Sequence, residues 1–352
     1  MKKIFRFFKF TLLAILSIIL LLIFYFFVSN RIFIGGQDQK FTDYLKTNQE
    51  QISDNIDGKL FDEKFYNSQI FLYGEVHGFA DNQKMDAIFL KFLNKKEGVR
   101  YYVAEMDSTN SDKLNRFLFG STKDQNLLTE VVTAVRKRIP QQSSIELLEK
   151  WNAVYDYNQT LADSLKISVL GVDTDFDNNS PKVSRDSAIM VNFTNSLKKL
   201  NIENEKFYGL FGFYHVLQRG TNGGKKPFAE RLKNSGFKVS SIVCYTLDSE
   251  MYLPKNPQFP TPADQKINII NADGPFMLVK GINDFSKLVQ PNSINLFKLD
   301  AKDSPYSKSD KLITIKSRIF GESFNPRQGT STLDYFQYIV LLKNSKALTP
   351  LM

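Results

Sequence analysis

Ten residues decide the fold of this chain: Gln69-Ile70-Phe71-Leu72-Tyr73-Gly74-Glu75-Val76-His77-Gly78. The stretch opens with a short apolar run of high β propensity, which Gly74 ends. A helical apolar face follows at Met85, Ile88, Phe89, Phe92 and Leu93. The sequence therefore predicts a buried strand, a turn that carries Glu75 and His77, and then a helix.

The same order of strand, polar turn and helix recurs downstream. Further strands are predicted at residues 99–104, 167–172, 206–211 and 238–245, with a last one at 333–342, and helices at 183–200 and 227–234. A mostly helical stretch, residues 111–165, is interrupted near Pro140 and lies between the second and third strands. This alternation predicts an α/β fold with a central, largely parallel sheet flanked by helices and carrying a helical insertion. Residues 250–310 are rich in Pro, Asn and Asp and yield no assignment.

The amino-terminal residues differ from the rest of the chain. Residues 1–9 carry four basic residues and no acidic one, and residues 10–28 are an uncharged run rich in Leu, Ile and Phe. A helix of that length rises about 28 Å, which is close to the hydrocarbon thickness of a bilayer. We expect an uncleaved transmembrane anchor rather than a cleaved signal peptide, because the run is long and no small-x-small site follows it.

Basic residues ahead of the span place the amino terminus in the cytoplasm. The chain is therefore expected to be a single-pass protein of the cell membrane that contacts lipid through this helix. Its carboxy-terminal domain would be extracytoplasmic, in a periplasm or at a cell surface. The predicted organisation is a cytoplasmic stub (1–9), a transmembrane helix (10–28), a linker with a short amphipathic segment (29–67) and one α/β domain (68–352).

Composition excludes several classes of protein. The chain has 352 residues and a net charge of +9, of which Lys2, Lys3, Arg6 and Lys9 lie ahead of the span. The rest is only mildly basic and has no stripe of basic residues, so we expect no nucleic-acid partner. The single cysteine, Cys244, excludes an intrachain disulfide framework and any Cys-based metal cluster, and its apolar strand predicts an inert core thiol.

Each of the first four predicted strands ends in polar residues. Glu75 and His77 follow the first strand, Glu105 the second, Asp173 the third, and Tyr214 and His215 the fourth. The carboxyl ends of parallel strands meet at one edge of a sheet, where ligands bind in open α/β folds. We therefore expect one pocket with two imidazoles and several carboxylates.

Such a pocket suits two kinds of chemistry. His77, His215, Glu75 and Glu105 have the mixed nitrogen and oxygen donors of a divalent metal site. The same side chains also suit general acid–base catalysis, with carboxylates orienting the histidines. Each residue also has a plain structural interpretation, as a helix cap, a loop carboxylate or a core histidine. The sequence contains neither a Gly-x-Ser-x-Gly elbow nor a His-Glu-x-x-His motif.

Two further features remain open at this point. Arg185 opens a predicted helix beside Asp186, where it could bind an anionic substrate or brace a carboxylate of the site. Residues 219–226 are glycine-rich and basic but lack the spacing of a phosphate-binding loop. They are interpreted as a mobile surface loop, with a lid over the pocket as the functional alternative.

These motifs resemble a known superfamily, that of the erythromycin-esterase-like, ChaN-like and Tiki/TraB proteins. The resemblance rests on Gly74-Glu75-Val76-His77-Gly78, Glu105, Arg185-Asp186 with Met190 and Asn192, and Gly212-Phe213-Tyr214-His215. It extends to Arg231-Leu232 with Gly236 and Val239 and to the closing stretch 334–350, and so covers most of residues 68–350. Because Val76 alone separates Glu75 from His77, the match is closer to the ChaN-like and Tiki-like members.

The resemblance implies an α/β fold with its site at one edge of the sheet. It implies Glu75, His77, Glu105 and His215 as the site, with Arg185 in support. Two functions follow from it. The first is a membrane-anchored extracytoplasmic hydrolase, acting on an ester or peptide with water activated by His77, with or without a bound metal. The second is a ChaN-like protein that holds haem or iron through His77, His215 or Tyr214.

Overall fold

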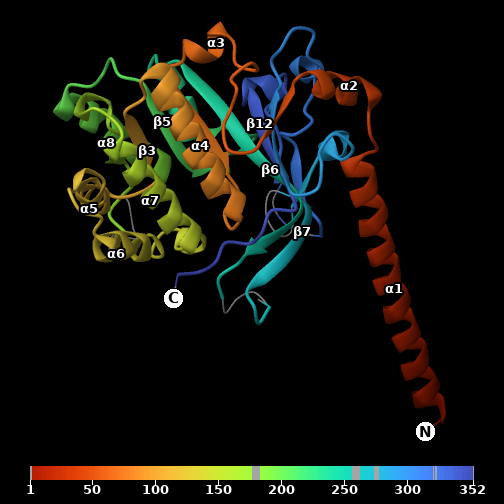
Figure 1. Ribbon diagram of the computed structural model, residues 1–352. Helices are drawn as coiled ribbons and strands as arrows, with labels where there is room; N and C mark the ends of the chain where they lie inside the picture. Colours follow the sequence, from red (N-terminus) through yellow and green to blue (C-terminus); the bar gives the residue numbers. More distant parts are fainter. Residues whose placement is uncertain are drawn as a thin grey trace.

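The computed structural model describes residues 2–176, 183–255, 262–272, 277–319, 321 and 323–351 (Figure 1). A central sheet with helices on both faces forms the body of the protein, and one long helix, α1 (Lys2–Ile34), extends away from it. The other helices are α2 (Gln39–Thr47), α3 (Glu63–Tyr66), α4 (Ala80–Glu97), α5 (Ser108–Phe119), α6 (Gln125–Val135), α7 (Ile145–Gln159), α8 (Arg185–Leu200) and α9 (Phe228–Asn234).

The main sheet has nine strands among the described residues, in the order β1-β9-β12-β6-β2-β5-β3-β4, with β7 beside β6. All pairs from β12 to β4 are parallel, whereas β1, β7 and β9 are added antiparallel. The strands are β1 (Gln49–Ile52), β2 (Ile70–Glu75), β3 (Tyr101–Ala104), β4 (Ser168–Gly171), β5 (Phe207–Gly212), β6 (Val239–Tyr252), β7 (Lys266–Ala272), β9 (Ser293–Lys298) and β12 (Tyr338–Lys343). The predicted α/β fold with a largely parallel sheet is confirmed.

The side chains of strand β2 explain why helices cover both faces of the sheet. All of its residues are buried, and their side chains alternate between the two faces. Phe71 and Tyr73 pack on the side of α4 and the helical insertion, whereas Ile70 and Leu72 pack on the side of α8 and α9. A strand with apolar residues on both faces must be covered on both faces, which is the usual setting of parallel strands.

The helical insertion lies between β3 and β4, as predicted. Asp107, Asp124 and Ser144 each accept a hydrogen bond from a backbone N–H of the helix they precede, so the three helices α5, α6 and α7 begin at polar caps. The predicted break near Pro140 is a short 3-10 turn, η1 (Pro140–Gln142). This turn approaches the carboxyl end of β2, because Gln142 contacts Glu75.

The segment predicted as a linker, residues 29–67, contains more structure than its polar composition indicated. Helix α1 continues past residue 28 to Ile34, and the predicted amphipathic segment is α2, which buries Phe41 and Leu45. Strand β1 then pairs antiparallel with β9 at the edge of the main sheet. A four-residue strand with one buried side chain has too weak an alternation to be recognised from sequence.

The region without a sequence assignment, residues 250–310, also contains strands. It includes β7, β9 and β8 (Met277–Val279), and β8 forms a small antiparallel sheet with β10 (Ile315–Ser317) and β11 (Ser323–Phe324). The final predicted strand begins later than residue 333, because residues Thr332–Asp334 form a 3-10 turn ahead of β12. Cys244 is buried in β6, as expected of a core thiol.

Helix α1 has the length and composition of a membrane span. Its residues Ile4–Ile34 are strongly apolar, and the most apolar window of the helix buries nothing against the rest of the protein. Leu, Ile and Phe side chains on it are about half or more exposed, for example Phe7 at 74% and Leu21 at 67%. An apolar helix that no protein surface covers is expected to be covered by lipid or removed as a signal sequence.

Candidate active site

The polar ends of β2, β3, β4 and β5 meet at one edge of the sheet. These four strands are neighbours in the order β2-β5-β3-β4 and run parallel, so their carboxyl ends lie together. The structure brings Glu75, His77, Glu105, Arg185 and His215 into one connected cluster, which we call the histidine–carboxylate cluster. This is the arrangement that the strand-end pattern predicted.

The first half of the cluster is Glu75 and His77. The Nδ1 atom of His77 lies 2.9 Å from Oε1 of Glu75, and Gln142 Nε2 donates to the same oxygen. Glu75 is only 1% exposed, while 28% of the His77 side chain remains exposed. An ionised Glu75 holds the proton of His77 on Nδ1, which leaves Nε2 with a free lone pair.

The second half is Asp186 and His215. Asp186 Oδ1 lies 2.6 Å from His215 Nδ1 and accepts a hydrogen bond of 2.8 Å from the backbone N–H of Phe228. His215 lies in the 3-10 turn η3 (Phe213–Val216), directly after β5. The two histidines therefore share one design, in which a buried carboxylate binds Nδ1 and orients the ring.

Glu105 joins the two halves. Its Oε2 accepts a 2.9 Å hydrogen bond from the backbone N–H of Gly212, and its Oε1 lies 2.7 Å from Arg185 and 3.4 Å from His215 Nε2. Gly212 has no side chain, and a Cβ there would lie 3.3 Å from His77 Nε2 and 3.6 Å from His215 Cδ2. The two rings therefore flank Gly212, and a Cβ there would be tight against His77 and in contact with His215.

Arg185 neutralises the carboxylates behind the histidines. Its Nε lies 3.2 and 3.1 Å from the two oxygens of Asp173, and its NH2 group reaches Glu105. Arg138 approaches Asp173 from the insertion, at 3.7 Å. Of the two roles left open for Arg185, the observed contacts match that of a brace for the carboxylates.

The pKa values of the cluster follow from these contacts. Burial acts to lower the pKa of His77, but Glu75 and Glu105 outweigh it, and the pKa of His77 is raised above 6.5. Burial is likewise outweighed at His215, whose pKa is raised by Glu105 and Asp186. Burial would raise the pKa of Glu105, yet Arg185 and the two histidines hold it below its ordinary value.

The fit of a metal ion was tested on the same geometry. No three His, Cys, Asp or Glu side chains converge into a metal-binding group among the residues that the structure describes. Both Nδ1 atoms are engaged by carboxylates, so the Nε2 atoms are the ring nitrogens that could face a ligand. Oε1 of Glu105 already contacts the guanidinium of Arg185 at 2.7 Å. The metal and haem expectations stay predictions.

Tyr214 points away from the cluster. Its hydroxyl donates to the carbonyl of Lys225 in the loop 219–226. That loop is tied down further, because Gly220 N–H donates to Glu230 and Asn222 N–H donates to the carbonyl of Asn325, at 2.7 and 2.8 Å. The structure therefore does not place Tyr214 with the two histidines.

The sequence reasoning missed three parts of the cluster. Asp186 was noted only beside Arg185 at the start of a predicted helix and as part of the resemblance, not as the partner of His215. Gln142 had no signal, since it reaches Glu75 from another part of the chain, across the insertion. The N–H of Gly212 is a backbone group, and only the register of β5 places it next to Glu105.

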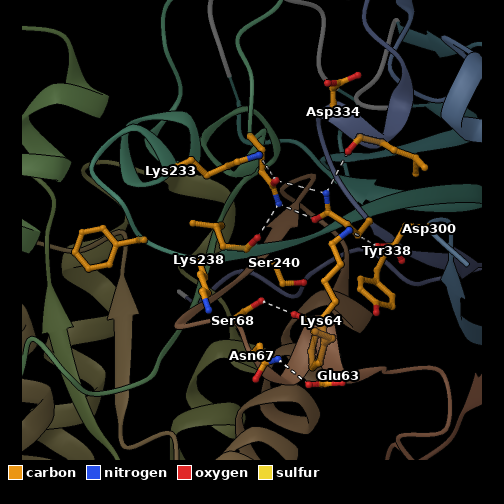
Figure 2. Close-up of a pocket in the computed structure, with 16 residues that line it drawn as sticks. Glu63, Lys64, Asn67, Ser68, Lys233, Lys238, Ser240, Asp300, Asp334 and Tyr338 are labelled. Carbon is orange, nitrogen blue, oxygen red and sulfur yellow. Dashed lines mark hydrogen bonds and ion pairs between the residues drawn. The ribbon is translucent and has the colours of Figure 1, made fainter.

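A pocket lies at the amino ends of the parallel strands, opposite the histidine–carboxylate cluster (Figure 2). Its volume is about 730 Å³, and Ser68, Ser240 and Tyr338, near the starts of β2, β6 and β12, line it together with Lys64 and Lys233. Lys233 donates to Gln218, whose amide is also bonded to Gln337. The pocket holds no histidine, and we do not assign the active site to it.

Comparison with known proteins gives the fold. No protein-family model matches the chain, and no curated protein is significantly similar to it. Among solved structures, a Bacillus cereus protein matches with a TM-score of 0.61 and 12% identity, over 89% of this chain and 99% of its own. A succinoglycan biosynthesis protein matches equally, with a TM-score of 0.61 and 12% identity, over 90% of this chain and 100% of its own.

A mutant erythromycin esterase in its open conformation is a more distant match. Its TM-score is 0.46 at 13% identity, over 79% of this chain and 91% of its own. At these identities the likeness concerns the fold alone. The chain therefore shares the fold of the first two proteins over nearly its whole length.

Proposed function

We propose that the protein is a membrane-anchored hydrolase whose histidine–carboxylate cluster activates water against an ester or amide carbonyl. The observation that carries the proposal is the pairing of both histidines with buried carboxylates on either side of Gly212. A single His–carboxylate pair is common as a structural feature. Two such pairs, joined through Glu105 at the carboxyl edge of a parallel sheet, form the arrangement expected of an acid–base site.

In the proposed reaction, His77 is the general base. Its Nε2 takes a proton from water while the water oxygen bonds to the substrate carbonyl carbon, and Glu75 stabilises the imidazolium that forms. Protonated His215 donates a hydrogen bond to the oxyanion and then gives its proton to the leaving group as the carbon–leaving-group bond breaks. Arg185 lowers the pKa of Glu105, and Glu105 together with Asp186 raises the pKa of His215, which favours its protonated form.

We further propose that α1 anchors the protein with its amino terminus in the cytoplasm and the α/β domain outside. Support comes from the uncovered apolar surface of α1 and from the basic residues at its start. Protease protection of a tag at either end, in intact and permeabilised cells, tests this orientation. Cleavage of the carboxy-terminal tag only after permeabilisation of the cell membrane itself would contradict it.

The catalytic proposal is tested with the full chain in detergent or nanodiscs, against p-nitrophenyl esters and a peptide library. His77→Ala and Glu105→Gln are expected to abolish hydrolysis, by about 10²-fold or more, with unchanged circular dichroism. Full activity in both variants would overturn the assignment.

The same preparation separates the alternatives. Elemental analysis of protein purified without chelator tests for a resident metal. Addition of haem with a search for a Soret shift tests the ChaN-like function. A Soret shift without hydrolysis of any ester or peptide would favour a binding protein over the hydrolase proposed here.

A further inference from the structure

Helix α1 extends from the domain in the direction in which the parallel strands point, toward the candidate site. Helix α3, which directly precedes β2, marks the amino ends of the parallel strands, and Figure 1 shows α1 running from the body of the protein toward the opposite end of the sheet. That opposite end is the carboxyl edge, where Glu75 and His77 lie. The carboxyl edge of the sheet therefore lies at the end of the domain toward which α1 runs (Figure 1).

We infer that the site faces the bilayer and that the substrate of the proposed hydrolase is an ester or amide carried by a membrane lipid. The inference rests on the proposed function and names its substrate class. Three observations support it: the fixed direction of α1, a set of unpaired cations where α1 leaves the domain, and a hairpin that extends from the site edge.

The direction of α1 is fixed by contacts in its last turns. Asn30 Nδ2 donates to the carbonyl of Arg318 at 2.7 Å, and the carbonyl of Ile34 accepts from the N–H of Gly281 at 3.3 Å. Asn283 donates to the carbonyl of Gly35, which follows the helix, at 2.8 Å. The helix is unbroken from Lys2 to Ile34, so its orientation at the domain determines where the membrane lies.

Three cations surround the end of α1. Lys316 Nζ lies 3.1 Å from Ser29 Oγ and 4.9 Å from the ring of Phe33, and Arg31 is on the helix itself. Within the described part of the chain, no carboxylate forms an ion pair with Arg31, Lys316 or Arg318, and Arg318 Nε is buried without a partner. Burial lowers the pKa of Lys316 and of Arg318, as expected of cations that lack a counter-charge.

These cations lie where the apolar span ends. In a membrane, residues just past such a span are at the level of the lipid headgroups, whose phosphates would supply the missing counter-charge. Lipid contact at this level would hold the domain close to the bilayer. The carboxyl edge of the sheet, which faces the same way as α1, is then presented to the membrane surface.

The β6–β7 hairpin extends the site edge in that direction. Strand β6 pairs with β2 only as far as Val243 and continues to Tyr252, whose N–H donates to the carbonyl of Gly78 at 2.9 Å. The hairpin is thus bonded to the turn that carries His77. Lys255, just beyond Tyr252, and Lys266, which pairs with Tyr252 across the hairpin, are exposed and suit anionic headgroups.

The geometry is tested by fluorescence quenching on the full chain in nanodiscs. Cys244 is buried, so one exposed cysteine can be labelled at a time. The probes are Ala263→Cys beside the hairpin and, as matched control, Ser235→Cys before β6 at the amino edge; both positions are exposed. A nitroxide on the lipid headgroup is expected to quench the first label at least twofold more than the second. Equal or reversed quenching would overturn the inference.

The substrate class is tested with two esters that share one fluorogenic leaving group, one on a phospholipid in the nanodisc and one soluble. We expect kcat/KM to be at least tenfold higher for the lipid-borne ester. The double variant Lys316→Gln/Arg318→Gln should lower that rate about fivefold or more and leave the soluble ester unaffected. Lys302→Gln/Lys308→Gln removes the same charge from exposed positions and is the control.

The outcomes separate the two proposals. Hydrolysis of the soluble ester without a preference for the lipid-borne one would overturn the substrate class and leave the proposed function standing. Hydrolysis of neither ester would overturn both.

Discussion

The protein has two clusters of buried charge, one in the core on the face of the sheet covered by α4 and α7 and one at the carboxyl ends of the strands, and their difference separates catalysis from stability. In the core, Lys150 binds Asp86, which also accepts hydrogen bonds of 2.8 Å from Tyr102 and Tyr208; the Lys150 side chain is 2% exposed and that of Asp86 0%. In the histidine–carboxylate cluster, 28% of His77 remains exposed. Both clusters pair carboxylates with cations, but only the second leaves a nitrogen for a ligand.

Both clusters contain buried charges, so exposure to solvent, and not charge, distinguishes a candidate catalytic site from a structural cluster. Aromatic rings pack against the Asp86 cluster, with Lys150 Nζ 4.2 Å from the ring centroid of Trp151 and 4.6 Å from that of Tyr102. Both charged side chains are almost fully buried, so we expect the cluster to stabilise the folded state. The pocket of Figure 2 is the converse case, because it is open and large but contains no comparable acid–base pair.

The largest expected effect is on stability. Lys150→Met leaves Asp86 charged and buried without its cation, and we expect the free energy of unfolding to fall by about 3–5 kcal/mol. Urea denaturation of the full chain measures it, and the activity per folded molecule should change less than twofold. Lys123→Met is the control, because Lys123 and Asp156 form an exposed pair whose loss should cost about 0–1 kcal/mol. Equal losses in the two variants would break the comparison.

A second effect is on activity alone. Asp186→Asn keeps an oxygen for the Phe228 N–H but removes the charge that holds His215, so we expect kcat to fall about 10- to 100-fold. The melting temperature should change little. Asp156→Asn, at an exposed carboxylate of the insertion, serves as control. A large fall in stability with normal kcat would assign Asp186 a structural role.

Activity and stability should depend differently on pH: activity should pass through a maximum, because the mechanism needs neutral His77 and protonated His215, whereas stability should fall as pH rises. A base must be neutral, so activity should rise with pH through the pKa of His77, which lies above 6.5. The stability that His77 and His215 contribute is fully present below about pH 6.5, their unfolded pKa, and is lost as pH rises through the raised folded values.

Glu75→Gln sharpens this prediction. It removes the charge that raises the pKa of His77, so the rising limb of activity should move to lower pH. Rate profiles and melting curves, both recorded from pH 5 to 9, measure the two trends. If the rising limb of the pH–activity profile stays at the same pH in Glu75→Gln, a group other than His77 controls the rate.

The smallest effect is expected at Gln142. Gln142→Met removes one hydrogen bond to Glu75, and a bond of this kind is worth about 0.5–1.5 kcal/mol, so kcat should fall roughly two- to tenfold. Its neighbour Gln141 is less buried, which makes Gln141→Met the matched control. Identical kcat values for the two variants would remove Gln142 from the account of the site.

Much of the fold was predictable because it depends on local pattern. The strands after Ser68, the helix after His77 and the break at Pro140 each follow from apolar spacing or backbone chemistry within a few residues. Strand β1 and the small sheet of β8, β10 and β11 were missed. These strands are short, and they are stabilised by partners far away in the chain, so their own residues show little alternation.

The residues of the candidate site likewise divide into those that local sequence patterns predict and those that they do not. Glu75, Glu105 and His215 could be assigned because each directly follows a strand, and parallel strands bring such positions together. Gln142 and the Gly212 N–H could not, since one arrives from the insertion and the other is a backbone group. Tyr214 was predicted to belong to the site because it precedes His215. Within one turn of η3, however, adjacent side chains point in different directions.

The sequence by itself determined an apolar helix ahead of an α/β domain, and a set of histidines and carboxylates at the ends of strands. Those features can be predicted from hydropathy and periodicity, which are patterns of a few neighbouring residues. Only the tertiary structure decided which carboxylate pairs with which histidine, that Arg185 fills the space beside Glu105, and that the site edge faces the same way as α1. These depend on strand order and on the docking of α1 against β8 and β10, contacts between residues far apart in the chain, which local patterns do not encode.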